Sequence, residues 1–287
     1  MDLLILKIIV IVIACFIASY TDFKKGYIYN WLSFPLICLG LIFLVLDCFI
    51  INLLGYIYFL KVIGIGVLIY LIGYLLYYFG KLGGGDIKLF IGLHLVLPYL
   101  NNQLTILWVI LFSSLLSVFI ISIVYSFKLI KVFRIKKIKF LDLLKSKINY
   151  IIKSVFFFLI FLFMLIYSFS TLYFNYLYFL ILIPILFGLF IVIFEKEVKE
   201  YIYLEYKLVN DLEDGDVLAV EYLKDLSLED LKLKNRTVIE EKDILRFKKS
   251  KKIKKLPIYY NLPKFGPFIF LGLIVFLLVS KYLFLIF

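Results

Sequence analysis

Residues 71–100 read LIGYLLYYFGKLGGGDIKLFIGLHLVLPYL, two apolar segments joined by a glycine-rich turn that ends in Asp86. Glycine has no Cβ, so three glycines in a row let the backbone bend tightly and let other groups approach the carboxylate. A carboxylate at the end of an apolar segment is costly in a membrane, and it marks a candidate functional site. This stretch indicates a bundle of membrane helices with a polar site at one end.

The rest of the chain has the same apolar character. Of its 287 residues, 64% are hydrophobic and only 18% are charged, too few to cover the surface of a water-soluble globule. We therefore predict an all-α integral membrane helical bundle of about eight transmembrane helices, with a small α+β cytoplasmic domain between the last two. The predicted spans, each close to the ~20 residues that cross a bilayer, are 3–21, 31–53, 56–79, 86–100 (a short one), 104–127, 151–170, 172–194 and 267–287.

The charges predict which side of the membrane each loop faces. The net charge is +12, and residues 128–194 alone carry nine basic and one acidic side chain. Basic loops of membrane proteins stay in the cytoplasm, so the excess indicates topology and not a nucleic-acid partner. We expect a multi-pass protein of the cell membrane, in contact with membrane lipids, with both termini extracellular and its candidate site facing the cytoplasm.

Composition also divides the chain into segments. The predicted domains are a membrane core (1–127), a basic cytoplasmic loop (128–150), a transmembrane hairpin (151–194), a soluble cytoplasmic domain (195–264) and a final transmembrane helix (265–287).

Within the soluble domain, alternation of apolar and polar residues at 201–209 and 217–223 predicts two strands of one hairpin, and 238–249 predicts a short helix. The basic segment 246–264 is either a strip along anionic headgroups or a positive flank of the last helix.

Two aspartates, Asp22 and Asp86, are the candidates for catalysis, because they fall at the same end of the first and fourth predicted spans. Two carboxylates held close together share one proton, and such a pair activates water. The ionised member takes a proton from the attacking water, while the protonated member hydrogen-bonds to the peptide carbonyl. Asp22 follows a helix C-terminus and Asp86 opens a helix, so the helix dipoles predict Asp86 as the ionised base and Asp22 as the acid.

Two motifs carry a resemblance to a known family. TDFKKGYIYN at 21–30 and GGGDIKL at 83–89, set between apolar helices, resemble the GxGD membrane aspartic peptidases, specifically the type IV prepilin and archaeal preflagellin (prearchaellin) peptidases. The resemblance covers about residues 10–127, and LPKFGPFIFLG at 262–272 is similar to the proline-containing segment that leads into the last helix of those enzymes. It implies that Asp22 and Asp86 are catalytic. The supporting motif residues that it implies are Gly83, Gly85, Lys88 and Asn30.

The resemblance also implies a function. It implies an archaeal aspartic endopeptidase that removes the short basic leader from type IV pilin-like or archaellin precursors at the cytoplasmic membrane face, with no cofactor and no metal. The paired CxxC motifs of bacterial members, which accompany a methyltransferase activity, are absent, which favours peptidase activity alone. One departure is Tyr29, which stands where the family usually has proline.

A turn in the soluble domain is a candidate for substrate binding. Its acids could attract a basic leader, although an ordinary acidic turn is the simpler interpretation. A calcium site is disfavoured because the spacing is not that of an EF-hand. The acids are Asp211, Glu213, Asp214 and Asp216.

Two other functions compete with this one. A presenilin-like GxGD intramembrane protease is disfavoured because its YD motif is absent, and an ion-coupled transporter because the two halves of the chain show no repeat. A zinc peptidase would need HExxH, which is absent, and the single histidine, His94, is expected to be structural.

The sequence does not distinguish archaellin from pilin precursors, and it does not give the cleavage-site preference or the oligomeric state.

Overall fold

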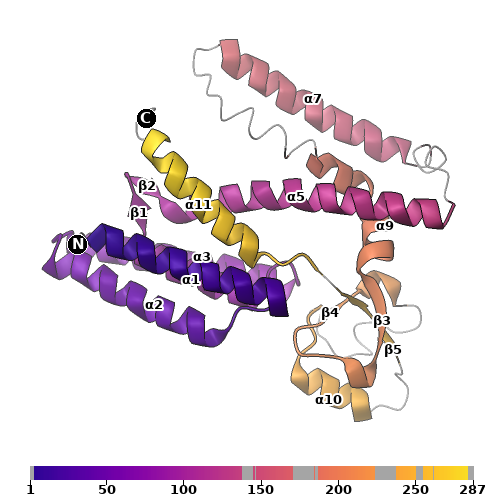
Figure 1. Ribbon diagram of the computed structural model, residues 1–287, viewed down its shortest axis with the longest axis horizontal. Coiled ribbons are helices and arrows are strands. Elements are labelled where there is room, and N and C mark those ends of the chain that lie inside the picture. Colours follow the sequence, from indigo (N-terminus) through magenta and orange to yellow (C-terminus); the bar gives the residue numbers. More distant parts are fainter. Residues whose placement is uncertain are drawn as a thin grey trace.

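The protein is a helical bundle joined to a small unit that contains a β-sheet (Figure 1). The computed structural model describes residues 3–137, 145, 147–170, 184, 187–223, 237–249, 255–260 and 262–283. The bundle consists of α1 (Leu3–Lys25), α2 (Asn30–Val45), η1 (Leu46–Ile50), α3 (Gly55–Tyr78), α4 (Gly84–Val96), α5 (Thr105–Ile135) and α11 (Gly266–Leu283). Helix α7 (Ile148–Ser170) lies outside this bundle.

Several helices are long and apolar enough to make this a multi-pass membrane protein. Within the described ranges, four helices meet both criteria, and they are Leu3–Lys25, Asn30–Ile50, Gly55–Tyr78 and Thr105–Ile135. Ile148–Ile160 and Gly266–Ser280 are shorter apolar helices, and α4 has only 13 residues. Much of the expected span at 172–194 lies outside the described residues. Eight transmembrane helices therefore remain a prediction.

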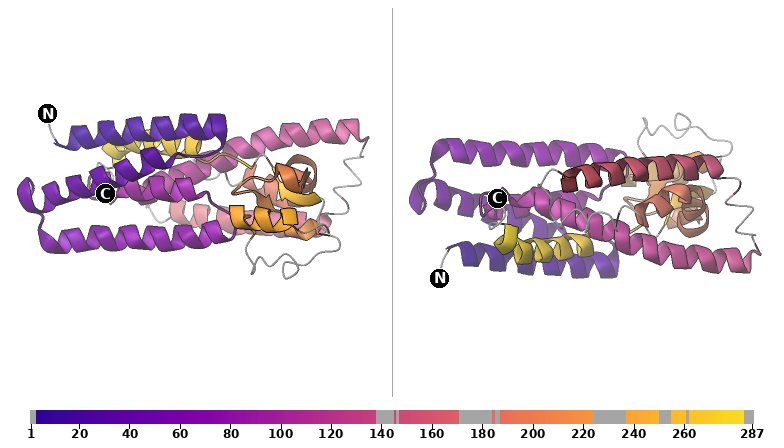
Figure 2. Two further views of the ribbon diagram at one scale, coloured as in Figure 1. Left: turned by 90° about the horizontal axis from the view of Figure 1, so that it is seen from below. Right: turned by 90° about the horizontal axis from the view of Figure 1, so that it is seen from above.

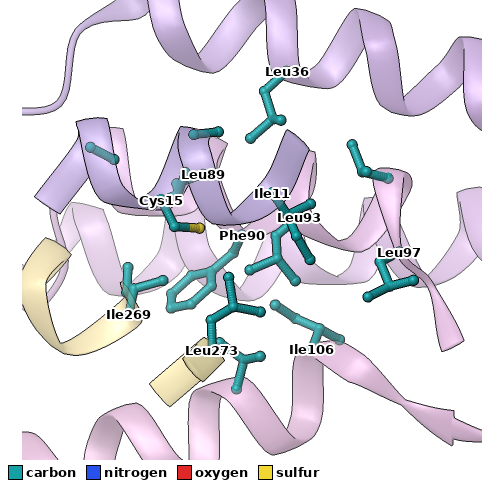
Figure 3. Packing of buried hydrophobic residues seen from close by; sticks show 14 of the residues in the cluster. Ile11, Cys15, Leu36, Leu89, Phe90, Leu93, Leu97, Ile106, Ile269 and Leu273 are labelled. Carbon is teal, nitrogen blue, oxygen red and sulfur yellow. The ribbon is translucent and has the colours of Figure 1, made fainter. Parts of the chain in front are cut away.

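Helix α4 is short, and its neighbours bury it on nearly every side. Leu89 and Leu93 are fully buried, and Figure 3 shows them with Phe90 among side chains of α1, α2 and α11. Glycines allow this close packing: a Cβ on Gly92 of α4 would lie 2.8 Å from the Leu36 side chain of α2. The bundle thus encloses α4, and with it the aspartate at its first turn.

Two glycines of α3, Gly66 and Gly73, also face α4. A Cβ on Gly73 would lie 2.8 Å from the Ile87 side chain, and one on Gly66 would lie 3.8 Å from His94. Gly80, which continues this seven-residue spacing, follows the end of α3 with a φ of 65° and faces the sheet-containing unit. A short hairpin, β1 (Tyr99–Leu100) and β2 (Gln103–Leu104), then joins α4 to α5.

The sheet-containing unit has three antiparallel strands in the order β3-β5-β4. The strands are β3 (Leu204–Leu208), β4 (Val217–Leu218) and β5 (Lys255–Tyr259). Helix α10 (Glu241–Lys249) packs on the sheet through Ile244 and Phe247. We call this unit the β module; it comprises residues 204–259, of which 204–223, 237–249 and 255–259 are described.

Two expectations for this module were wrong. The predicted strands at 201–209 and 217–223 do not pair with each other, because β5 lies between them as the central strand. The second of them stops at Leu218 because the chain turns into a short 3-10 helix, η4 (Val220–Tyr222). Residues 255–259 do not lie along headgroups, since Leu256 and Ile258 are fully buried in the module core.

Helix α5 connects the bundle with the module. Its 31 residues extend over about 46 Å at 1.5 Å per residue, more than a ~30 Å hydrocarbon core requires. Figure 2 shows that α5, in magenta, continues past the ends of the other bundle helices. Its last turns bury Leu129 and Phe133 against Phe194 and Val198. These contacts hold α9 (Glu195–Val198) and η2 (Lys199–Tyr203), which lead directly into β3.

Candidate active site

Asp22 lies in the last turn of α1, and Asp86 lies in the first turn of α4. Both are buried, with exposures of 6% and 8%. Helices α1 and α4 pack against each other, and each carries its aspartate in the turn at this end of the bundle. The structure therefore brings the two predicted aspartates to one place at the end of the bundle where α1 ends and α4 begins, which we call the aspartate end.

The glycines before Asp86 explain how its carboxylate is held. The backbone N–H of Gly83 donates a hydrogen bond to Oδ2 of Asp86, with 3.3 Å between the atoms, and so caps the start of α4. A Cβ on Gly83 would lie 2.9 Å from the same oxygen. The φ of Gly83 is −75°, which any residue can adopt, so the backbone conformation does not require glycine. Glycine is needed because a side chain would collide with the carboxylate of Asp86.

The next two glycines differ from each other. A Cβ on Gly85 would lie 2.9 Å from Cβ of Ile28, in the loop between α1 and α2. A Cβ on Gly84 would meet only the ring of Tyr77 at 3.6 Å, an ordinary contact distance. The structure thus gives a steric reason for glycine at positions 83 and 85. At position 84 a larger residue such as alanine would fit.

Asp22 is held by the start of α11. The backbone N–H of Gly266 donates a hydrogen bond to Oδ2 of Asp22 over 2.8 Å. A Cβ on Gly266 would lie 2.9 Å from that oxygen, so only glycine fits against the carboxylate. Lys264 Nζ donates a hydrogen bond to the backbone oxygen of Phe23 over 2.8 Å, at the C-terminal end of α1. The positive charge of Lys264 stabilises the C-terminal end of α1, where the helix dipole is negative.

Gly266 is a site residue that the sequence interpretation did not assign. The one signal for it was the similarity of residues 262–272 to the segment before the last helix of the family, with glycine and proline at a helix start. The ring of Phe265 also packs on Phe90 of α4, with 6.3 Å between the centroids. The start of α11 therefore contacts both aspartate-bearing helices.

Two predicted motif residues also meet. Lys88 Nζ donates a hydrogen bond to Oδ1 of Asn30 over 2.7 Å, joining the first turns of α4 and α2. The same ammonium group lies 5.0 Å from the ring centroid of Phe34. With the contact between Gly85 and Ile28, this hydrogen bond fixes the α1–α2 loop against α4.

Tyr29 fits the position where the family usually has proline. Its φ of −72° and ψ of 140° are values that proline adopts readily, so proline would fit this backbone conformation. Lys25 Nζ donates a hydrogen bond to the Tyr29 hydroxyl over 2.6 Å. This hydrogen bond lowers the pKa of Tyr29. The departure at position 29 therefore does not require a backbone conformation that proline could not adopt.

The four acids of the predicted substrate-binding turn lie in the β module, and two of them have structural partners. Asp216 forms an ion pair with Lys207 at 3.1 Å, and Asp214 accepts a hydrogen bond from the backbone N–H of Glu241 at the start of α10. Asp211 and Glu213 are exposed. Asp214 is exposed as well, so any attraction of a basic segment rests on Asp211, Glu213 and, in part, Asp214.

Two other buried polar groups lie away from the aspartate end. His94 is fully buried, and its Nε2 lies 3.0 Å from the backbone oxygen of Val62. Asp47, in η1, is paired with Lys7 and accepts a hydrogen bond from Asn52 over 3.0 Å. Within the described residues, no group of three or more His, Cys, Asp or Glu side chains is arranged to hold a metal ion.

Comparison with known proteins identifies the same part of the chain. Residues 9–127 match the type IV leader peptidase family, which confirms the resemblance inferred from the motifs. The prepilin peptidase EppA of Methanothermobacter thermautotrophicus is 33% identical over 95 residues, which are 33% of this chain and 24% of that protein. The matched region thus spans about a quarter of this relative. No solved structure is significantly similar.

Proposed function

Because residues 9–127 belong to the type IV leader peptidase family, we propose that this chain is a membrane aspartic endopeptidase whose catalytic pair is Asp22 and Asp86. The observation that carries the proposal is the meeting of these two buried carboxylates at one end of an apolar bundle, where each accepts a hydrogen bond from a backbone amide. Buried carboxylates are costly in such surroundings, and their retention as an interacting pair favours a catalytic role.

The start of α11 favours negative charge on Asp22. From the ends of α1 and α4 alone, the sequence predicts Asp86 as the ionised member. The structure adds the N-terminal amide of α11, donated by Gly266 over 2.8 Å, while the amide of Gly83 lies 3.3 Å from Asp86. Helix N-termini and short hydrogen bonds both stabilise a carboxylate. We therefore assign the shared proton to Asp86 and the role of base to Asp22.

The reaction then follows the logic of general acid–base catalysis. Asp22 takes a proton from a water molecule as the water oxygen attacks the peptide carbonyl carbon. Asp86 donates a hydrogen bond, and then its proton, to the carbonyl oxygen. Collapse of the tetrahedral intermediate breaks the C–N bond: Asp22 gives its proton to the leaving amine, and a hydroxyl of the intermediate returns a proton to Asp86 as the carboxylic acid forms. The backbone amides of Gly83 and Gly266 keep both carboxylates in place throughout.

The substrates that we propose are type IV pilin-like or archaellin precursors with a short basic leader. The aspartate end also carries Lys24, Lys25, Lys88 and Lys264, and basic residues mark the cytoplasmic side of membrane proteins. In this orientation, both chain termini lie outside the cell. A precursor inserted with its leader in the cytoplasm would present its scissile bond at headgroup depth, next to the aspartates.

The test is cleavage of a purified pilin-like precursor by the chain in detergent or lipid, followed by mass spectrometry of the products. Asp22→Asn and Asp86→Asn should each abolish cleavage, while the exposed acid Glu205, changed to Gln, should leave it intact. Full cleavage by either Asn variant would show that the pair is not catalytic. Ion uptake into vesicles without cleavage would instead indicate a transporter.

A further inference from the structure

The β module touches the turn that leads to the aspartate motif. A Cβ on Gly80, just after α3, would lie 2.8 Å from Oγ1 of Thr237 and 3.1 Å from Cγ1 of Val217. These distances leave no room for a methyl group, so the two surfaces are in tight contact. Only two residues, Lys81 and Leu82, separate Gly80 from the Gly83 amide that caps Asp86.

The module side of this contact belongs to a folded unit. Leu218 donates a backbone hydrogen bond to the oxygen of Thr237 over 2.8 Å, and Val217 forms a β-bridge with Val238. Val217 also pairs with Tyr259 of the central strand. The backbone of the residues that meet Gly80 is thus held in place by pairing within the module.

The turn side is also fixed. Gly80 has a φ of 65°, and the N–H groups of Gly80 and Lys81 donate hydrogen bonds to the oxygens of Tyr77 and Leu76, over 2.8 and 2.9 Å. This is the Schellman arrangement that ends a helix at a left-handed glycine. The position of Gly80 therefore determines the direction in which the chain leaves α3 and continues to Gly83 and Asp86.

The same module also leads to the other aspartate. Strand β5 ends at Tyr259, and the next residue, Tyr260, donates a backbone hydrogen bond to the oxygen of Tyr203 over 2.8 Å. The chain then reaches Lys264, which binds the end of α1, and Gly266, which binds Asp22. One folded unit is thus joined to the segments that hold both carboxylates.

We propose that the β module is a positioning element for the catalytic pair, acting on Asp86 through the contact of Thr237 and Val217 with Gly80. This inference rests on the proposed function, and it assigns a role to residues beyond the family match at 9–127. Thr237 and Val217 touch no substrate. They are positioning residues, and their effect is on kcat, because a small displacement of a catalytic group costs rate more than binding.

Gly80→Ala tests the contact, with Gly55→Ala as its matched control. Gly80 follows the end of α3 and Gly55 begins it, and both have a positive φ, 65° and 83°, so alanine is strained at both positions. A Cβ on Gly55 meets nothing within 4 Å, whereas one on Gly80 meets Thr237. Gly80→Ala should lower kcat about ten- to a hundredfold relative to Gly55→Ala, with KM changed less than about twofold.

A second substitution separates the contact from strain within the turn. In the double variant Gly80→Ala/Thr237→Ala, the closer contact is removed while Cγ1 of Val217 stays 3.1 Å from the new methyl group, so kcat should rise at least about threefold above the Gly80→Ala value. Hydrogen exchange gives a readout without activity: the amides of residues 83–87 should exchange faster in Gly80→Ala than in Gly55→Ala. If Gly80→Ala does not fold, Thr237→Leu adds bulk from the module side and should lower kcat in the same way.

The outcomes distinguish this inference from the proposed function. A wild-type chain that cleaves no precursor defeats the proposed function. A wild-type chain that cleaves, with equal kcat for Gly80→Ala and Gly55→Ala, overturns the positioning role and leaves the proposed function standing. Failure of Thr237→Ala to raise the kcat of the Gly80→Ala variant would also overturn it, as would an unchanged kcat in Thr237→Leu.

Discussion

The backbone N–H of Gly266 donates a hydrogen bond to the carboxylate of Asp22 over 2.8 Å, although 244 residues separate the two. Gly266 opens the last described helix, and Asp22 closes the first. The pair therefore joins the first and the last described helices at the candidate active site. It makes α11 part of the site, beside the two helices that carry the aspartates.

The first prediction concerns this hydrogen bond. Gly266→Ala should lower kcat about a hundredfold, because the added Cβ would lie 2.9 Å from Oδ2 of Asp22 and would push the carboxylate away. Gly64→Ala is the control, since a Cβ at that helical glycine of α3 meets nothing within 4 Å. Cleavage kinetics of the two variants check this. Equal kcat values would show that Asp22 does not depend on the start of α11.

The second prediction separates the three glycines before Asp86. Gly85→Ala should abolish most activity, because its Cβ would lie 2.9 Å from Cβ of Ile28. Gly84→Ala should keep activity within about twofold, since its nearest neighbour is a ring at 3.6 Å and alanine favours the helix that begins there. Parallel measurement of kcat and of the thermal unfolding midpoint checks both. Equal losses at positions 84 and 85 would contradict the packing described here.

Much of the site could be predicted from the sequence, because charge is rare in its apolar segments. Asp22 and Asp86 stand out for this reason, and the triple glycine points to close packing around Asp86. Gly266 could not be found in the same way, because no local pattern shows which segment will donate a hydrogen bond to a residue 244 positions away.

The fold was predictable to a similar degree. Apolar length indicates membrane helices, but it placed the end of the fourth span at residue 100, whereas α4 ends at Val96. This helix of 13 residues is stabilised by the helices that surround it. In the β module, alternation located β3 correctly. It could not show that β5, which comes later in the chain, would lie between β3 and β4.

The third prediction concerns the Lys88–Asn30 hydrogen bond. The two groups lie partly in solvent, so we expect a coupling free energy of only about 0.5 kcal/mol between Lys88→Ala and Asn30→Ala in a double-mutant cycle of unfolding. Their joint effect on kcat should be larger, because the bond fixes the α1–α2 loop against the aspartate helix. Strictly additive effects on both quantities would show that the hydrogen bond has no role in solution.

The fourth prediction concerns substrate attraction by the β module. Asp211→Asn combined with Glu213→Gln removes two of the three exposed acids and leaves Asp214 and Asp216 in their structural contacts. For a precursor with a basic leader, KM should rise about two- to fivefold at low ionic strength, and the difference should disappear at high salt, with kcat unchanged. A KM that stays constant at low salt would remove these acids from the substrate-binding site.

The last prediction distinguishes a structural carboxylate from the catalytic ones. Asp47 is as buried as Asp22, with exposures of 5% and 6%, but it is paired with Lys7 away from the aspartate end. Asp47→Ala leaves the ammonium of Lys7 buried without its partner, and this should reduce the free energy of unfolding by about 3–5 kcal/mol. The double variant Lys7→Met/Asp47→Leu, which replaces the pair by apolar side chains, should recover most of that loss.

At a temperature where all variants are folded, kcat should remain near the wild-type value, in contrast to its loss in Asp22→Asn. A loss of kcat in the stable double variant would show that this second buried carboxylate also contributes to the reaction.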